Sequence, residues 1–157
     1  MSSSPEARLK SLGIELPAPP KPAASYVTAT RSGRLVFVSG QGPIANGEVV
    51  YRGKVGADLT EQQGYDAARL TILNTLAILR QEAGSLDQVT RILKLLAWVR
   101  CADGFQRQHM VVNGASDLLV EIFGERGRHA RSAVSAHELP FGIAVEIEVV
   151  AEVASTV

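Results

Sequence analysis

The segment between Thr60 and Gly84 is the feature that most limits how this chain can fold. Thr60 is followed three residues later by Gln63, which is the spacing of a capping box at a helix N-terminus. Gly84 is a residue type that commonly ends helices. Between these two signals, apolar side chains recur at the helical period, at Ala67, Leu70, Ile72, Leu73, Leu76, Ala77 and Leu79. The sequence therefore predicts a long helix with one apolar face, which we expect to pack on a sheet.

The other periodic segments supply that sheet and a second long helix. The second helix is predicted over 105–123, ended by Gly124 and weakened by Asn113-Gly114. Apolar and β-branched runs bounded by turn residues predict six strands, at 26–30, 34–38, 48–51, 91–100, 132–137 and 144–154. Residues 39–43 are expected to end the second strand, and Asn46-Gly47 makes a tight turn before the third. This order indicates an α+β two-layer fold, with two long helices on one face of a mixed six-stranded sheet.

The chain has 157 residues, which fits one domain. We expect residues 1–25 to form an N-terminal surface arm, a short helix at 5–12 and then an extended proline-rich stretch, and residues 26–157 to form the single domain. No apolar run approaches the roughly 20 residues of a membrane helix, and no secretory signal opens the sequence. A single cysteine, Cys101, excludes an internal disulfide. The expected location is the cytoplasm.

The sequence contains no motif that indicates a cofactor site or a metal site. The stretch Gly40-Gln41-Gly42-Pro43 satisfies a loose dinucleotide pattern, but it leads into a strand and not into the helix that would meet a pyrophosphate. Cys101 has no base placed beside it, so we interpret it as a structural thiol. The spacing of the possible zinc ligands is not one that zinc sites use; these ligands are Cys101, His109, His129 and His137. We therefore expect no metal and no cofactor.

The overall charge does not favour nucleic acid as a partner. The 16 basic and 16 acidic residues cancel, and aromatic residues make up only 5% of the chain. Nucleic-acid affinity comes mostly from lysine and arginine contacts to phosphates, and single-strand binding adds stacking on aromatic rings. A small molecule is the better expectation.

Arg131 is the first candidate for binding such a molecule. On a strand it shares a face with Ala133, Ser135 and His137, so small side chains lie beside the guanidinium. A hollow of this kind suits a planar carboxylate, which a guanidinium binds through two parallel hydrogen bonds. An arginine in a surface salt bridge fits the same pattern, and the residues alone leave both interpretations open.

The last predicted strand places glutamates on one face. Its apolar residues are expected to face the core, whereas Glu146, Glu148 and Glu152 share the opposite face. Such a stripe is usually solvated. One of these acids could instead transfer protons if another chain or loop covers this side of the sheet, and the pattern does not say which one.

Several short segments together resemble the reactive-intermediate deaminase (Rid/YjgF) family, over about residues 24–154. They are Tyr26, residues 35–41, Ala130-Arg131-Ser132, Leu139-Pro140 and residues 145–148. The resemblance implies a chorismate-mutase-like fold and a homotrimer with three clefts between neighbouring subunits. It also implies hydrolysis of reactive enamine and imine acids, which arise from pyridoxal-phosphate enzymes, to 2-oxo acids and ammonia without a cofactor.

By the same resemblance, site roles fall on particular residues. Arg131 would hold the substrate carboxylate, and Glu146 would direct water and shuttle a proton. Tyr26 and Ser39 would line the pocket, and backbone around Gly40 and Ala133 would complete it.

The sequence also departs from the family pattern, which suggests a divergent branch with a different pocket entrance. His129 stands where the family often has proline, and Ala133 where it often has cysteine. The stretch 105–131 and the N-terminal arm are longer than usual. Two alternatives stay open: a non-catalytic module that binds a small carboxylate through Arg131, and a ribonuclease or translation inhibitor.

Overall fold

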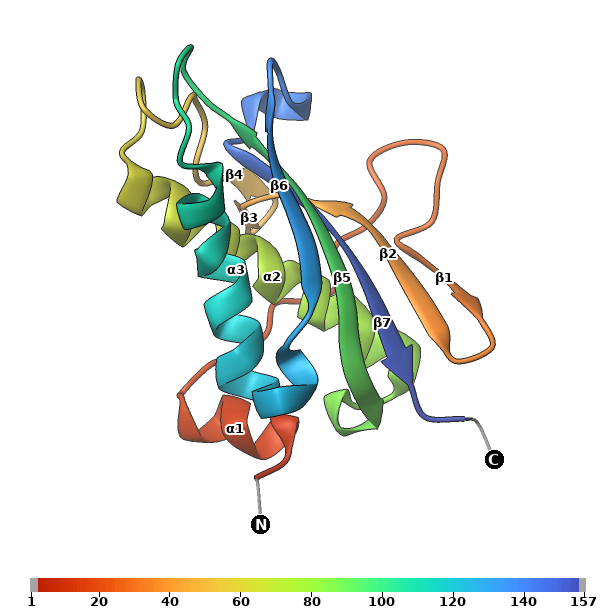
Figure 1. Ribbon diagram of the computed structural model, residues 1–157. Coiled ribbons are helices and arrows are strands. Elements are labelled where there is room, and N and C mark those ends of the chain that lie inside the picture. The colour runs from red at the N-terminus through yellow and green to blue at the C-terminus, as the bar shows by residue number, and fades with distance from the viewer. Residues whose placement is uncertain (1–2, 156–157) are drawn as a thin grey trace.

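A five-stranded mixed sheet forms one layer of the computed structural model, which describes residues 3–155 (Figure 1). Its strands are β1 (Ala29–Ser32), β2 (Leu35–Gln41), β5 (Val89–Arg100), β6 (Ala130–Ala136) and β7 (Val145–Val153). The order across the sheet is β1-β2-β7-β5-β6, and only the pair of β5 and β6 is parallel. β6 and β1 are therefore the two edges of the sheet.

Two long helices form the second layer, as Figure 1 shows. α2 (Glu61–Ala83) packs against β2 and β7, and α3 (Gln108–Phe123) packs against β5 and β6. The predicted capping box is present, because Thr60 Oγ1 accepts from the Gln63 backbone at 3.1 Å and Gln63 Oε1 accepts from the Thr60 backbone at 2.9 Å. The predicted α+β two-layer architecture, with two long helices on one face of a mixed sheet, is confirmed. Among the described residues, no helix is both long and apolar enough to cross a membrane.

The main sheet has five strands and not the predicted six. β3 (Ile44–Ala45) and β4 (Glu48–Val49) form a separate two-stranded ribbon. The turn between them has positive φ at both Asn46 (53°) and Gly47 (79°). A two-residue turn of this kind folds a strand back on its immediate neighbour in sequence, so β4 pairs with β3 instead of joining the main sheet.

Strand β2 continues past the point where the sequence predicted its end. Its pairing with β7 shifts between Val38 and Gln41, so that Ser39 and Gly40 together face one residue of β7, Glu148. This is a β-bulge, which keeps the strand in the sheet while it bends locally. Residues 39–41 therefore bend the strand without ending it.

The core fills the space between the helices and the sheet. On β7 the predicted alternation is confirmed, since the odd-numbered residues from Val145 to Val153 are buried. α3 is continuous through Asn113-Gly114, where the sequence predicted a weak point. A β-carbon at Gly114 would lie 2.0 Å from the backbone oxygen of Tyr65, so glycine is what allows α3 to approach α2 this closely.

The N-terminal arm begins with a docked helix, α1 (Pro5–Ser11), near the end of α3 in Figure 1. Leu9 is buried, and the Glu6 carboxylate accepts hydrogen bonds from Arg80 and from the Leu86 backbone. The boundary predicted after residue 25 stays a prediction. Residues 1–2 of the predicted arm and 156–157 of the predicted domain lie outside the described residues.

Candidate functional site

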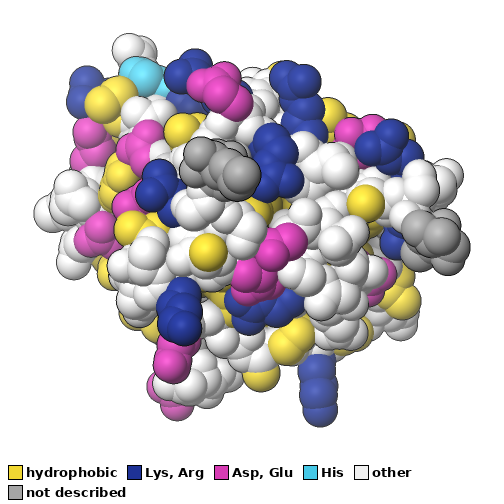
Figure 2. Space-filling view, turned by 90° about the horizontal axis from the view of Figure 1, so that it is seen from below, with side chains coloured by type: hydrophobic (Ala, Val, Ile, Leu, Met, Phe, Trp, Pro, Cys, Tyr) yellow, Lys and Arg dark blue, Asp and Glu magenta, His cyan; other side chains and the backbone are white. Residues whose placement is uncertain are grey.

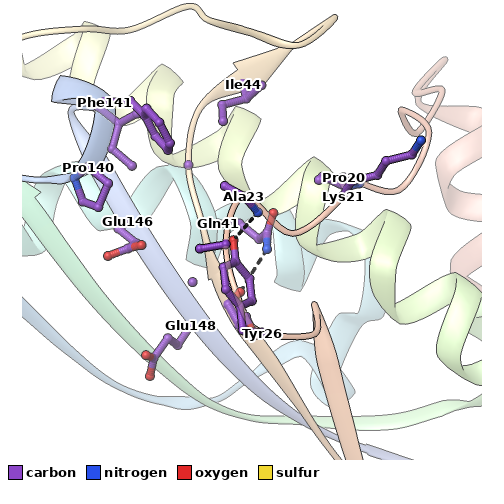
Figure 3. Close-up of a pocket in the computed structure, with 15 residues that line it drawn as sticks. Pro20, Lys21, Ala23, Tyr26, Gln41, Ile44, Pro140, Phe141, Glu146 and Glu148 are labelled. Carbon is purple, nitrogen blue, oxygen red and sulfur yellow. Dashed lines mark hydrogen bonds between the residues drawn. The ribbon is translucent and has the colours of Figure 1, made fainter.

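A cleft of about 470 Å³ opens on the side of the sheet that the helices leave uncovered (Figure 3). Its walls come from residues 20–26 of the arm, the bulge of β2, the loop at 140–143, and β7. Four of the residues implied by the family resemblance line it together: Tyr26, Ser39, Gly40 and Glu146. These four residues converge although they are up to 120 residues apart in the sequence.

Glu146 is a half-buried carboxylate in the wall of this cleft. Within residues 3–155, no group forms a hydrogen bond or ion pair with it. Burial raises the pKa of Glu146 above the ordinary value for a glutamate, and the nearby negative charge of Glu148 raises it further. Glu148 is the next residue on the same face of β7 and is exposed. A free carboxylate whose pKa lies closer to neutrality suits proton transfer better than an ordinary surface glutamate does.

Gly40, in the bulge of β2, lies directly against this carboxylate. A β-carbon at Gly40 would be 2.8 Å from Glu146 Oε1 and 3.0 Å from Glu146 Cδ. Real β-carbons essentially never come so near, so any larger residue at Gly40 would displace the acid. The bulge therefore places bare backbone where the Glu146 side chain needs room.

Two hydroxyl groups complete this part of the wall, and both are held by backbone atoms. Ser39 Oγ donates to the Val27 carbonyl at 2.7 Å. Tyr26 precedes β1 and does not lie in the strand predicted for it, because its backbone N–H turns back to the Ala24 carbonyl at 2.9 Å. Its phenolic oxygen accepts from the Ala23 backbone at 3.0 Å, which leaves the phenolic hydrogen for another acceptor.

Phe141 lies at the rim of the cleft and was not among the residues predicted for the site. Its φ of 59° is in the left-handed region, which is rare for an aromatic residue, and it is 61% exposed. The Arg52 guanidinium donates to the Phe141 carbonyl and helps to fix this backbone conformation. An exposed ring on strained backbone beside a cleft is a combination that clusters at functional sites. The one sequence feature that could have drawn attention to Phe141 is its place between Pro140 and Gly142, in a turn after Leu139.

The N-terminal arm also contributes to the wall, although the sequence analysis treated it only as a surface arm. Pro20, Lys21, Ala23 and Ala24 line the cleft. Lys21 is the one cationic residue among the described lining residues, and its ammonium points away from Glu146 and Glu148 (Figure 3). The proline-rich stretch at 17–22 indicates an extended segment, but it does not indicate which surface that segment contacts.

Arg131 and Ala133 do not reach this cleft within one protomer. In the parallel pair of β5 and β6, Arg131 is level with the buried Leu95, so its side chain projects toward the helices. There Arg131 Nη1 donates to Ser116 Oγ at 3.0 Å, and Nη2 donates to the His109 carbonyl at 2.8 Å. Ala133 packs against the core on the same side. The Arg131 guanidinium is therefore bound to α3 in this protomer and does not face the cleft.

The remaining candidates are spread over the molecule. Cys101 is buried, and its Sγ accepts from Gln108 Nε2 at 3.6 Å. His109 and His137 are exposed, while His129 is half-buried beside Ser116. Across residues 3–155, no three His, Cys, Asp or Glu side chains lie close enough together to hold a metal ion.

The chain is similar in sequence and fold to several known proteins. Residues 6–153 match the family model described as "YjgF/chorismate_mutase-like, putative endoribonuclease". The protein TCP17 of Trypanosoma cruzi is 44% identical over 147 residues, which are 93% of this chain and 92% of TCP17. The crystal structure described as a putative endoribonuclease from Shewanella oneidensis is 35% identical with a TM-score of 0.93, covering 96% of this chain and all of that one. The structure of TdcF from E. coli with bound serine is 27% identical with a TM-score of 0.61, covering 87% of this chain and 94% of that one.

Proposed function

The chain belongs to the YjgF/chorismate mutase-like family, and from that premise we propose that it is a cofactor-free hydrolytic deaminase of reactive enamine and imine acids. The products would be 2-oxo acids and ammonia. The observation that carries the proposal is Glu146, an unpaired half-buried carboxylate with a raised pKa in the wall of a small cleft. We place the reaction in the cytoplasm, beside the pyridoxal-phosphate enzymes that release such intermediates.

The reaction needs little beyond orientation and one acid/base group. The imine reacts as its protonated iminium form. Glu146 takes a proton from water as the water oxygen forms its bond to the iminium carbon, and the C=N electron pair moves to nitrogen. Glu146 then gives this proton to the amine nitrogen, the C–N bond breaks as the O–H electron pair forms the carbonyl, and the released hydroxyl proton passes through Glu146 to the departing ammonia. The imine carbon is already electrophilic, so positioning and proton transfer supply most of the required rate enhancement.

The substrate carboxylate requires a cation, and the proposal assigns this role to Arg131 of a neighbouring copy in a homotrimer. β6 is an edge strand, so Arg131 is located where a second copy can approach. Large apolar side chains are exposed on the uncovered face of the sheet, at Leu35, Phe37 and Val134. A subunit interface would bury them. TdcF with its bound serine supports a carboxylate ligand of amino-acid size for this protein.

The direct test generates 2-aminoacrylate with a serine or cysteine lyase and follows the additional rate of pyruvate release. Glu146→Gln keeps the size and hydrogen-bonding reach of the side chain but cannot take a proton, so we expect a loss of roughly 10²- to 10⁴-fold. Glu148→Gln is the matched control on the same face and should keep most of the activity. If wild-type protein accelerates the release from no imino acid, or if both variants match it, the deaminase proposal is wrong.

Cleavage of RNA is a second candidate, because the description of the matched family names a putative endoribonuclease. The cleft itself speaks against it, since its described lining has two carboxylates and one lysine that points away from them. On the face shown in Figure 2, basic and acidic side chains are interspersed and form no extended basic patch. RNA affinity needs such a patch for phosphate contacts. Cleavage of RNA by clean wild-type protein, lost in Glu146→Gln, would favour this candidate.

Variants at Arg131 and Glu146 distinguish the deaminase from a module that only binds a small carboxylate. It would require Arg131 but would tolerate Glu146→Gln. Calorimetry with pyruvate on both variants, beside the rate assay, distinguishes the two.

A further inference from the structure

Hydrogen bonds link Arg131 to His129 through Ser116, outside the cleft described above. Arg131 Nη1 lies 3.0 Å from Ser116 Oγ, and Ser116 Oγ lies 2.8 Å from His129 Nε2. His129 Nδ1 lies 2.6 Å from the backbone oxygen of Gly127. We propose that this series, the Arg131 relay, makes Ser116 and His129 positioning residues that hold the Arg131 guanidinium for the substrate carboxylate. The inference rests on the proposed function.

Both ends of the relay fix the direction of its hydrogen bonds. The Gly127 carbonyl can only accept, so His129 Nδ1 must carry a hydrogen. In the neutral ring, Nε2 is then the acceptor, and the Ser116 hydroxyl must donate to it. A guanidinium can only donate, so Ser116 Oγ accepts from Arg131. The relay is satisfied in one arrangement when His129 is neutral.

The surroundings of His129 favour its neutral form. Burial lowers the pKa of His129, and the positive charge of Arg131 lowers it further, against the hydrogen bond to Gly127. The neighbouring elements also carry charged groups on α3, in the turn at 124–128 and on β5, which are Asp117, Glu121, Arg126, Lys94 and the exposed ion pair of Arg128 with Glu125. Protonated His129 would offer a second cationic donor to Ser116 Oγ, in competition with Arg131.

Held in this way, Arg131 still has hydrogens for a ligand. It uses one N–H each from Nη1 and Nη2, toward Ser116 and the His109 carbonyl. A guanidinium has five N–H groups, so about three remain, enough for the two parallel bonds that a carboxylate accepts. Both anchors belong to α3, two turns apart, so the helix sets the plane of the guanidinium.

Two substitutions at one position separate the relay from a merely structural histidine. His129→Asn places a donor near Nδ1 and keeps the contact to Gly127, but it leaves Ser116 without an acceptor. His129→Gln places a carbonyl oxygen near Nε2 and restores that acceptor. We expect His129→Asn and Ser116→Ala to raise the dissociation constant of pyruvate by about tenfold, the effect of one lost hydrogen bond to a charged group. His129→Gln should stay within about threefold of wild type.

The readouts are calorimetry with pyruvate, the split between KM and kcat for 2-aminoacrylate, and the ¹⁵N spectrum of the His129 ring. Loss of carboxylate positioning should raise KM while kcat changes little. The ring should carry its hydrogen on Nδ1 at neutral pH. Melting temperatures identify any variant that is simply unfolded, and Ser116→Ala tests the relay without touching the histidine.

The possible failures can be told apart. Equal binding by His129→Asn, His129→Gln and wild type, or a ring hydrogen on Nε2, would overturn the relay and leave the deaminase proposal intact. Wild-type protein that binds no 2-oxo acid would refute the proposed function, and with it the ligand role of the relay.

Discussion

Arg131 and Glu146 project from opposite faces of the same sheet. Arg131 is level with the buried Leu95 and reaches α3, whereas Glu146 is level with Trp98 and lines the cleft on the uncovered face. Because their side chains point to opposite faces, Arg131 and Glu146 cannot contact the same small ligand within one protomer. A site that uses both must take them from two copies.

Mixing two inactive variants tests this arrangement. Arg131→Ala and Glu146→Gln should each be inactive alone, yet mixed trimers should recover activity. Random mixing of equal amounts should restore about a quarter of the wild-type rate, because each mixed trimer has one cleft with both residues intact. Mixing Arg131→Ala with the Arg131→Ala/Glu146→Gln double variant is the control and should restore nothing. No recovery after confirmed subunit exchange would show that the two residues do not act together across an interface.

Gly40→Ala should inactivate the protein without unfolding it. The added methyl would lie 2.8 Å from Glu146 Oε1 and would push the carboxylate out of position. We expect the deaminase rate to fall by roughly 10²-fold or more, as for loss of an acid/base group. Gly42→Ala is the comparison, since its β-carbon would meet the flexible end of Ile143 at 2.7 Å. A Gly40→Ala variant with the wild-type rate would mean that the position of Glu146 does not matter.

The pH profile should respond to Glu148. Glu146 must be ionised to act as a base, so the rate falls as the pH drops through its pKa, which burial and then Glu148 raise. Glu148→Gln removes the second contribution, lowers the pKa of Glu146 and should shift the acidic limb to lower pH. The shift should shrink at high salt, because Glu148 is exposed. An acidic limb that moves upward, or does not move at low salt, would contradict this account.

The same pKa shift predicts that Glu146 costs stability at neutral pH. Its pKa is higher in the folded than in the unfolded protein, so folding binds a proton between the two values. Its favourable contribution is present below the unfolded pKa and is lost as the pH rises through the folded pKa. Glu146→Gln should therefore raise the melting temperature at pH 7 relative to wild type and have no such effect near pH 3. Equal melting curves at both pH values would argue that the carboxylate is well solvated.

Phe141 should trade stability for ligand binding. Phe141→Gly and Phe141→Ala both remove the exposed ring, but only glycine removes the cost of φ 59°. We expect the glycine variant to be more stable than the alanine variant by about 1 kcal/mol, measured by denaturant unfolding. Both should weaken binding of 2-oxo acids equally. Unchanged binding would restrict Phe141 to the turn.

Local signals in the sequence predicted the elements well, because they act over a few residues. Thr60 and Gln63 define the start of α2 by their own contacts, and the alternation in β7 identifies its buried face. The predicted number of strands in the main sheet was wrong because the Asn46-Gly47 turn pairs β4 with β3 in a separate ribbon. The packing role of Gly114 was missed for a related reason. Its role depends on Tyr65, 49 residues away, which spacing within α3 cannot reveal.

The candidate site was predictable only in part. Tyr26, Ser39, Gly40 and Glu146 were named through the family resemblance, and the fold brings them to one cleft. The side of the sheet taken by Arg131 depends on its register with Leu95, which a single strand does not encode. Phe141 and the arm residues were missed because a rim and a wall are properties of the assembled fold.

The wall built from the N-terminal arm is a strap fixed at both ends. At one end α1 is anchored through Glu6 to Arg80 and the Leu86 backbone, and at the other the chain enters β1. Between these anchors, Pro20, Lys21, Ala23 and Ala24 border the cleft without belonging to the sheet that carries Glu146. Insertions or substitutions in the strap can therefore reshape the opening while the acid keeps its place. The shape of the opening and the position of the acid can change separately in this architecture, the first in residues 20–24 and the second in β7.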